Sequence, residues 1–229
     1  MTVVLGDPGF LLPERKARID EVVALRTRTL TVVMEALCDP QNVNAVLRTC
    51  EAFGVQEVHA IEGPQKRFDP NKKVTQNADK WLDVRRWPST RACLGFLKAE
   101  GYRIYATHLG TDSVPLGELS FAPRVALVFG NEHAGVSDEA VSLADVNFTI
   151  PMFGFSRSFN VSVAAAITLA RAVERRFAER GRHGDLGEVE AAALRERFYM
   201  LAVKQRTRMA KAERAEARRE RHAKAKGGT

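Results

Sequence analysis

The sequence lacks the features that would place the protein in a membrane or outside a reducing compartment. Its 229 residues contain no apolar run near the roughly 20 residues that a membrane-spanning helix needs. The first ten residues carry no Lys or Arg, so the basic start of a secretory leader is missing. The three cysteines are odd in number and lie among apolar neighbours: Cys38, Cys50 and Cys93. We therefore expect a cytoplasmic protein with reduced core thiols and no membrane partner.

Fingerprints of several common cofactor and metal sites are also absent. There is no G-x-G-x-x-G dinucleotide loop, no G-x-x-x-x-G-K-[ST] phosphate loop and no G-x-S-x-G nucleophile elbow. No Cys and His residues have the spacing of zinc ligands. These absences argue against a Rossmann-type nucleotide site, a P-loop NTPase and an α/β-hydrolase, and we expect no metal.

Charge is present but unevenly distributed. Lys and Arg exceed Asp and Glu by seven over the whole chain. Residues 195–229 alone carry a net charge of +8, whereas the 194 residues before them carry −1. A near-neutral body with one strongly basic end predicts a polyanionic partner that binds at that end.

Strand-like and helix-like patterns alternate along the middle of the chain. The first expected helix begins at Pro13. Further helices are expected at residues 39–53, 89–100, 137–143 and 159–180. The expected strands are residues 30–34, 55–61, 81–87, 102–107, 124–129 and 146–150, and residues 63–79 are expected to form a loop. This alternation predicts an α/β domain with a mainly parallel sheet flanked by helices.

Three regions follow from these patterns. Residues 1–28 form an N-terminal basic helix, whose basic face would hold Arg15, Lys16, Arg18, Arg26 and Arg28. Residues 29–180 form the α/β domain. Residues 181–229 form a C-terminal basic helical extension, which begins with a glycine-rich break at 181–187 that we interpret as a hinge.

Two segments have compositions that folding alone does not explain. In Asn42-Val-Asn-Ala-Val-Leu-Arg48, two asparagines occupy the first turns of a helix and Arg48 lies one turn beyond Asn44 on the same face. Taken alone, this is also compatible with a capped helix start and a surface arginine. In Phe129-Gly-Asn-Glu-His-Ala-Gly135, a buried strand runs into a two-glycine loop that carries Glu132, at the end of the strand where parallel α/β proteins form their sites. The alternative here is a tight turn with a solvated acid.

A third segment runs from Ile150 to Val163. Its strand breaks at Pro151 and turns at Gly154, and Ser158 and Asn160 then lie at the start of a long helix. Helix starts expose backbone N–H groups that favour anions and polar ligands. Ser158 could instead be a simple N-cap.

Together the three segments resemble, in order and spacing, the motifs of the SpoU branch of SPOUT-class RNA methyltransferases, which methylate ribose 2′-hydroxyls. The resemblance covers about residues 30–175, and Asn42-x5-Arg48, Gly130-x-Glu132-x2-Gly135 and Ile150-Pro-Met152…Ser158-x-Asn160 carry it. The flanking helices are most similar to the tRNA guanosine-18 2′-O-methyltransferase subgroup. Arg157 and Phe159 stand where that subgroup often has Gln and Leu, which bears on substrate preference.

The resemblance implies a fold, a donor and an assembly. The fold would be a trefoil-knotted, mainly parallel sheet, with S-adenosylmethionine as methyl donor held by backbone groups and no metal. By position, the donor site would include Thr107, Gly130, Ile150, Met152 and Phe159. The protein would be a homodimer whose active site draws residues from both subunits.

The resemblance also assigns catalytic roles. The catalytic set would be Arg48, Asn42, Glu132, Ser158 and Asn160, with Arg48 proposed as a general base. A guanidinium resists deprotonation, because its pKa lies above about 12. We therefore favour Arg48 as a clamp on the adjacent phosphate that orients the hydroxyl, while the role of base stays open.

The expected partner is RNA, with the D-loop guanosine 18 of tRNA as the favoured target. Two alternatives stay open: methylation of 23S rRNA, and a non-catalytic RNA-binding module on the same scaffold. Structured RNA is recognised through phosphates, 2′-hydroxyls and shape. The basic ends would supply those contacts, with Arg15, Arg18, Lys204, Arg206 and Arg208 as candidates.

Overall fold

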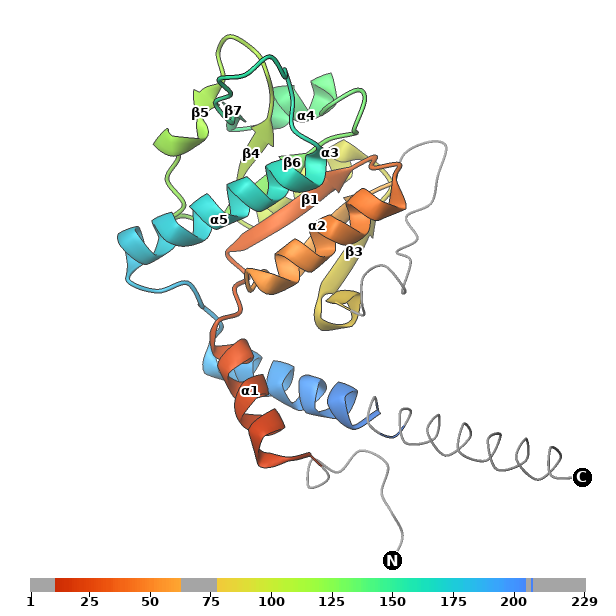
Figure 1. Ribbon diagram of the computed structural model, residues 1–229, viewed down its shortest axis with the longest axis vertical. Helices are drawn as coiled ribbons and strands as arrows, with labels where there is room; N and C mark the ends of the chain where they lie inside the picture. The colour runs from red at the N-terminus through yellow and green to blue at the C-terminus, as the bar shows by residue number, and fades with distance from the viewer. Residues whose placement is uncertain (1–10, 63–77, 205–206, 208–229) are drawn as a thin grey trace, which may run out of the picture. The chain divides into compact units, whose positions relative to one another are not determined.

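A computed structural model describes residues 11–62, 78–204 and 207 of the chain (Figure 1). The chain divides into two compact units. The larger unit comprises residues 25–186 and holds the sheet together with all three segments identified from the sequence. The smaller unit combines residues 1–24 with 187–229. Within the described residues, no helix is long and apolar enough to cross a membrane.

The larger unit is built around one seven-stranded sheet in which every strand pairing is parallel. In spatial order the strands are β3 (Asp83–Trp87), β2 (Glu57–Ile61), β1 (Leu30–Glu35), β6 (Val125–Phe129), β4 (Arg103–Thr107), β7 (Val146–Thr149) and β5 (Val114–Pro115). All residues of β1 and β6 are buried, as expected of central strands covered on both faces. The predicted α/β class with a mainly parallel sheet is therefore confirmed.

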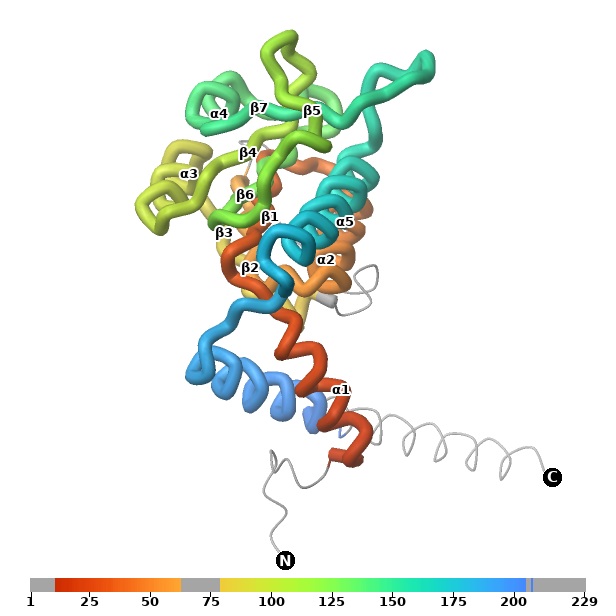
Figure 2. The backbone as a smooth tube through the Cα atoms, turned by 90° about the vertical axis from the view of Figure 1, so that its left-hand side faces the viewer, coloured from red at the N-terminus to blue at the C-terminus, as the bar shows by residue number. Residues whose placement is uncertain are grey.

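Helices cover the two faces of this sheet (Figures 1 and 2). Helices α2 (Pro40–Ala52) and α5 (Val161–Arg180) pack together on one face, and α3 (Thr90–Ala99) and α4 (Asp138–Leu143) pack together on the other. Successive residues of β1 point to opposite faces of the sheet. Val32 belongs to the hydrophobic core under α2 and α5, and Val33 to the core under α3 and α4.

Local sequence signals explain where most helices begin and end. Asp39 caps α2, because its side chain accepts from the backbone N–H of Gln41, and Pro40 supplies the first helical residue. Gly54 follows α2 with a φ of +75°, which only glycine adopts readily, and a Cβ there would lie 2.5 Å from the carbonyl oxygen of Leu25. Ser89 and Ser137 cap α3 and α4 in the same way as Asp39 caps α2.

The structure departs from the sequence expectations in three places. Helix α5 begins at Val161, and its N-cap is Asn160 rather than Ser158. Strand β5 and the short 3-10 helices η2 (Ala78–Trp81) and η3 (Leu116–Glu118) were not expected, because elements this short leave no periodic signal. Most of the expected 63–79 loop lies outside the described residues.

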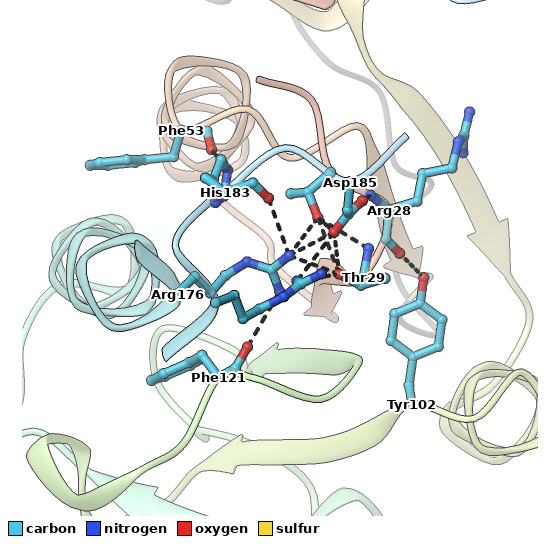
Figure 3. A network of polar contacts seen from close by, with 10 residues as sticks. Arg28, Thr29, Phe53, Tyr102, Phe121, Arg176, His183 and Asp185 are labelled. Atoms are coloured by element: carbon cyan, nitrogen blue, oxygen red, sulfur yellow. Dashed lines mark hydrogen bonds and ion pairs between the residues drawn. The ribbon is translucent and has the colours of Figure 1, made fainter. Parts of the chain in front are cut away.

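The boundary between the two units falls inside the predicted glycine-rich break at 181–187, but residues 183–185 of that break are anchored to the larger unit. The Asp185 carboxylate accepts from the Thr27 hydroxyl at 2.6 Å, from the backbone N–H of Arg28 at 2.9 Å and from Thr29. Arg176 Nη2 donates to the same carboxylate at 2.6 Å, and Figure 3 shows these groups converging. One buried ion pair with several hydrogen bonds therefore holds residue 185 against the start of β1.

Two arginines expected on the first basic helix are part of this packing instead. The helix α1 (Pro13–Ala24) ends before them. Arg26 is 1% exposed and pairs with Glu51 at 2.7 Å. Arg28 is half-buried and pairs with Glu57 at 3.1 Å and Asp83 at 2.6 Å. Both cations therefore form ion pairs within the larger unit and do not belong to a basic face of α1.

The smaller unit contains α1 and a helix at residues 188–204. Asp20 of α1 accepts from Arg195 Nε and from the Tyr199 hydroxyl, each at 2.8 Å. Leu194, Phe198 and Ala202 are buried at helical spacing, which gives the second helix one apolar face. The rest of the predicted C-terminal helix lies outside the described residues, apart from Thr207.

Candidate active site

The site forms where the two central strands end. Strands β1 and β6 are parallel neighbours, so the loops that follow them meet at one edge of the sheet. The loop after β6 carries Glu132, and its carboxylate accepts from the backbone N–H groups of Cys38 and Asp39, each at 3.2 Å. Both donors lie at the end of the loop after β1, just before α2. Glu132 therefore joins the two loops.

Glu132 also contacts a side chain of the first of the three motifs, residues 42–48. Asn42 Nδ2 donates to Glu132 Oε1 at 3.1 Å. Burial by itself would raise the pKa of Glu132, but the hydrogen bonds from Asn42 and from the backbone at Cys38 and Asp39 outweigh it, and the pKa lies below its usual value. Glu132 is thus an anion that accepts hydrogen bonds, not a proton donor at neutral pH.

The third motif joins the same chain of contacts. Asn160 Nδ2 donates to Asn42 Oδ1 at 3.0 Å. Asn160 Oδ1 in turn accepts from the Ser162 backbone N–H at 2.9 Å and from its hydroxyl at 2.6 Å. Because both amides use donor and acceptor ends, the orientation of each is determined. Glu132, Asn42 and Asn160, which we call the polar triad, bring all three motifs together.

The loop that carries Glu132 has little freedom. Asn131 and Gly135 pair through two backbone hydrogen bonds of 2.8 and 2.9 Å, and Asn131 Nδ2 donates to the Ala36 carbonyl at 2.8 Å. A Cβ on Gly130 would lie 2.2 Å from the backbone of Gly135 and Val136, so glycine is required there. Sequence reasoning missed Asn131, although an asparagine in the turn just after a buried strand was a signal for such a role.

A buried acid that sequence reasoning also missed supports this edge. Glu35, at the end of β1, is 4% exposed. It accepts from the Ser137 backbone N–H at 2.9 Å, from the Ser137 hydroxyl at 2.7 Å and from the Thr90 hydroxyl. It therefore ties the end of the Glu132 loop to the start of α3. An acid ending an otherwise apolar strand was the available signal.

Arg48 lies on α2, six residues after Asn42, and its side chain is exposed. Among the described residues, its guanidinium forms no ion pair or hydrogen bond. Asn44 lies one turn before it and is 1% exposed, with neither amide atom hydrogen-bonded in the described part of the chain. An exposed cation on the helix that also carries Asn42 is free to engage an anionic ligand.

The candidate donor residues gather at the same edge of the sheet. Thr107 ends β4, Gly130 follows β6 and Ile150 follows β7, and these three strands are neighbours. The Thr107 hydroxyl donates to the Val128 carbonyl at 3.2 Å. Met152 and Phe159 lie in the segment between β7 and α5. Ser158 is exposed in that segment and takes no part in the polar triad.

The segment from 152 to 159 has a backbone suited to binding a ligand. Among the described residues, its backbone N–H and C=O groups make no backbone hydrogen bonds. Phe159 is 41% exposed, so one apolar ring is available beside these polar groups. In the part of the chain that the structure describes, no group of His, Cys, Asp or Glu is arranged to hold a metal ion.

The thiols and the candidate RNA contacts are only partly as expected. Cys50 and Cys93 are buried, but Cys38 is exposed beside Glu132, so the prediction of a core thiol is wrong there.

Arg15 and Lys204 are exposed, and Arg18 is exposed and pairs with Glu21 at 3.0 Å. Arg206 and Arg208 lie outside the described residues.

Comparison with known proteins adds an independent result. Residues 29–170 match the sequence profile of the SpoU rRNA Methylase family. The chain is 36% identical over 195 residues to the tRNA (guanosine(18)-2'-O)-methyltransferase of Borreliella burgdorferi, covering 85% of this chain and 88% of that protein. It is 40% identical over 163 residues to the tRNA (guanosine(18)-2'-O)-methyltransferase of Thermus thermophilus, covering 71% and 84%. The A. aeolicus TrmH/SpoU tRNA modifying enzyme has a similar crystal structure, with a TM-score of 0.76 and 33% identity, covering 83% of this chain and 97% of that chain.

Proposed function

The chain belongs to the SpoU rRNA Methylase family, and from this premise we propose that it methylates a ribose 2′-hydroxyl of tRNA, at guanosine 18 of the D-loop. The observation that carries the proposal is the polar triad: Glu132, Asn42 and Asn160 come from three separate motifs and are hydrogen-bonded in one row, and Asn42 lies on the same helix as Arg48. The choice of tRNA rests on the substrate named for the Borreliella and Thermus relatives.

The donor would be S-adenosylmethionine, which supplies a methyl group made reactive by its attachment to a sulfonium. The backbone groups of residues 152–159 and the half-exposed ring of Phe159 fit such a ligand, because they offer polar atoms beside an apolar surface. Thr107, Gly130 and Ile150 would complete the site from the ends of β4, β6 and β7.

Arg48 would hold the phosphate next to the reacting ribose and orient the hydroxyl toward the methyl group. The donor would supply its methyl group to the 2′-oxygen and leave as the neutral thioether S-adenosylhomocysteine, while the hydroxyl proton would pass to solvent. The satisfied hydrogen bonds of the polar triad would keep α2, and with it Arg48, in place during the reaction. Ser158 would help to hold the donor or the nucleotide from the segment before α5.

We propose a homodimer with a shared site. The family resemblance implies this assembly, and Val163 on α5 is an exposed apolar side chain, at 44%, close to the end of the candidate donor segment. Sedimentation velocity should give twice the chain mass. A monomer that is fully active would exclude a shared site.

The basic ends would bind the rest of the RNA. Arg15, Arg18 and Lys204 are exposed in the smaller unit, and Arg206 and Arg208 continue the same sequence. Each phosphate contact adds about 0.7–0.9 to the slope of log affinity against log salt. Deletion of residues 205–229 should weaken tRNA binding and flatten this slope, and an unchanged slope would exclude a role for the deleted cations.

The deciding experiment uses labelled S-adenosylmethionine and defined transcripts. The wild-type protein should label a tRNA transcript, and mass spectrometry should place the methyl group on the ribose of guanosine 18. A transcript with a 2′-deoxy nucleotide at that position should not be labelled, and a 23S rRNA transcript serves as the competing substrate. Absence of donor binding by calorimetry would favour the non-catalytic RNA-binding alternative.

A further inference from the structure

The loop between β7 and α5 exposes two large aromatic rings. We call residues 152–158 the aromatic loop. Phe153 is 99% exposed and Phe155 is 107% exposed relative to the reference residue, and Gly154 separates them. Figure 2 shows this segment projecting from the body of the larger unit. Isolated exposed apolar residues are common, but two fully exposed rings within three residues mark a surface for a partner.

The position of the loop places these rings beside the polar triad. The loop leads directly into Asn160, whose side chain is hydrogen-bonded to Asn42 at 3.0 Å. Five peptide units connect Phe155 to Asn160, so their Cα atoms are at most about 18 Å apart even for a fully extended chain. A ligand at the polar triad therefore has neighbouring groups within reach of the aromatic loop.

The composition of the loop favours a nucleobase over an apolar protein surface. Arg157 follows the rings and is exposed, and among the described residues it forms no ion pair or hydrogen bond. Ser156 and Ser158 flank it and are exposed as well. Phe and Arg occur in protein–protein interfaces too, but serines are depleted there, whereas arginine and serine side chains are common partners of phosphate oxygens. Unpaired bases, in contrast, stack on Phe rings and on Arg guanidinium planes, with the cation also near the phosphates.

We propose that Phe153 and Phe155 form a stacking platform for an unstacked base next to the methylated ribose, with Arg157 contacting the RNA backbone. This inference rests on the proposed function for the identity of the RNA. A nucleoside in a folded D-loop must lose some of its stacking before its 2′-hydroxyl can reach the site, and a protein ring that takes over the stacking offsets that loss. Both residues act on the position of the substrate and not on the reacting atoms.

The test replaces the rings by aliphatic side chains of similar hydrophobicity. In the double variant Phe153→Leu/Phe155→Leu, the KM for tRNA should rise about 10- to 100-fold, as expected for the loss of one or two stacked bases. The rise in KM should exceed any change in kcat at saturating tRNA, and the sedimentation coefficient should not change. The Kd for S-adenosylmethionine is measured in parallel, because the backbone of this segment also belongs to the candidate donor site. The double variant Phe153→Trp/Phe155→Trp should restore a KM near the wild-type value, because Trp also stacks. Phe177→Leu, on the half-exposed face of α5, is the matched control and should leave the KM unchanged.

A direct readout uses 2-aminopurine in place of a base next to guanosine 18. Its fluorescence should change when the wild-type protein binds, and much less when the double Leu variant binds. An unchanged KM in the double Leu variant would overturn the proposal. A lower oligomer mass in that variant would also overturn it, by showing that the rings bind a second copy, and a weaker donor Kd would assign them to the donor site. If wild-type protein binds tRNA without methylating it, the proposed function fails, while the fluorescence change and the tRNA Kd still decide whether the rings stack on a base.

Discussion

Asn160 Nδ2 donates to Oδ1 of Asn42 at 3.0 Å, although the two residues are 118 positions apart in the chain. Asn42 Nδ2 in turn donates to Glu132, which is 90 positions from Asn42 in the chain. The start of α2, the loop after β6 and the start of α5 are thus held by a single row of side chains.

Arg48→Ala should lower kcat/KM about 100- to 1,000-fold, because it removes a cation that aligns the reacting hydroxyl. The Kd for S-adenosylmethionine should remain near the wild-type value, since Arg48 is exposed on α2 and forms no hydrogen bond or ion pair with the candidate donor residues in the described part of the chain. Single-turnover assays and calorimetry measure the two quantities. Arg91→Ala, which removes an exposed cation from α3, is the control. Substantial activity in the Arg48 variant would exclude it from catalysis.

Glu132→Gln should destabilise the site by about 1–3 kcal/mol, because an amide places N–H groups against donors that the carboxylate satisfied. The donors are the Asn42 amide and the backbone N–H groups of Cys38 and Asp39. Urea unfolding should show the loss, and turnover should fall with it. Glu188→Gln makes the same change at an exposed position and should have no effect. Equal stability of the two variants would show that the Glu132 contacts do not contribute.

Gly130→Ala should destabilise the protein by about 1–3 kcal/mol or more and weaken donor binding, because overpacked groups must shift. The added methyl would lie 2.2 Å from the backbone of Gly135 and Val136. Gly117→Ala is the control, since nothing lies within 4 Å of the Cβ position there. Thermal unfolding compares the variants, and a stable Gly130→Ala protein would mean that the loop can open without cost.

Stability should fall as the pH drops from about 6.5 to about 4, in part because of His59. Burial and the nearby Arg85 lower the pKa of His59 to about 4, and its Nδ1 accepts from Trp87 Nε1 at 2.9 Å. The unfolded chain therefore binds a proton in this pH range that the folded chain excludes. The shift corresponds to about 3 kcal/mol at the acid end.

His59→Asn tests this assignment, because its Oδ1 can accept from Trp87 but does not titrate. The pH dependence of unfolding between 4 and 6.5 should become flatter. His183 will keep part of the dependence, since burial also lowers the pKa of its ring. An equally steep profile in the variant would show that His59 is not responsible.

The buried pair of Arg176 and Asp185 should show strong coupling. Asp185→Asn should cost about 3–5 kcal/mol, because it leaves the guanidinium of Arg176 buried without a counter-charge. The double variant Arg176→Met/Asp185→Asn should cost less than the sum of the single changes. Glu174→Gln breaks an exposed pair with Arg171 and should cost below about 1 kcal/mol. Additive effects in the double-mutant cycle would show that the pair contributes no interaction energy.

Several features were predictable because local chemistry determines them. Asp39 and Pro40 signalled the start of α2, Gly54 signalled its end, and the apolar run before Gly130 signalled a buried strand. The contacts of Glu35 and Asp185 were not predictable in this way. Each of these acids accepts hydrogen bonds from segments far away in the chain, and no periodicity in the sequence records which segments those are.

By itself, the sequence determined the alternation of strands and helices, the caps and the three motifs that resemble the SpoU branch. Only the tertiary structure decided that Asn42, Glu132 and Asn160 meet, that Arg26 is buried while Arg48 is exposed, and that the glycine-rich segment after α5 is held by Asp185. The reason is physical: caps and periodicity depend on neighbours within a few residues, whereas these contacts depend on the order in which β1, β6, β4 and β7 pair in the sheet.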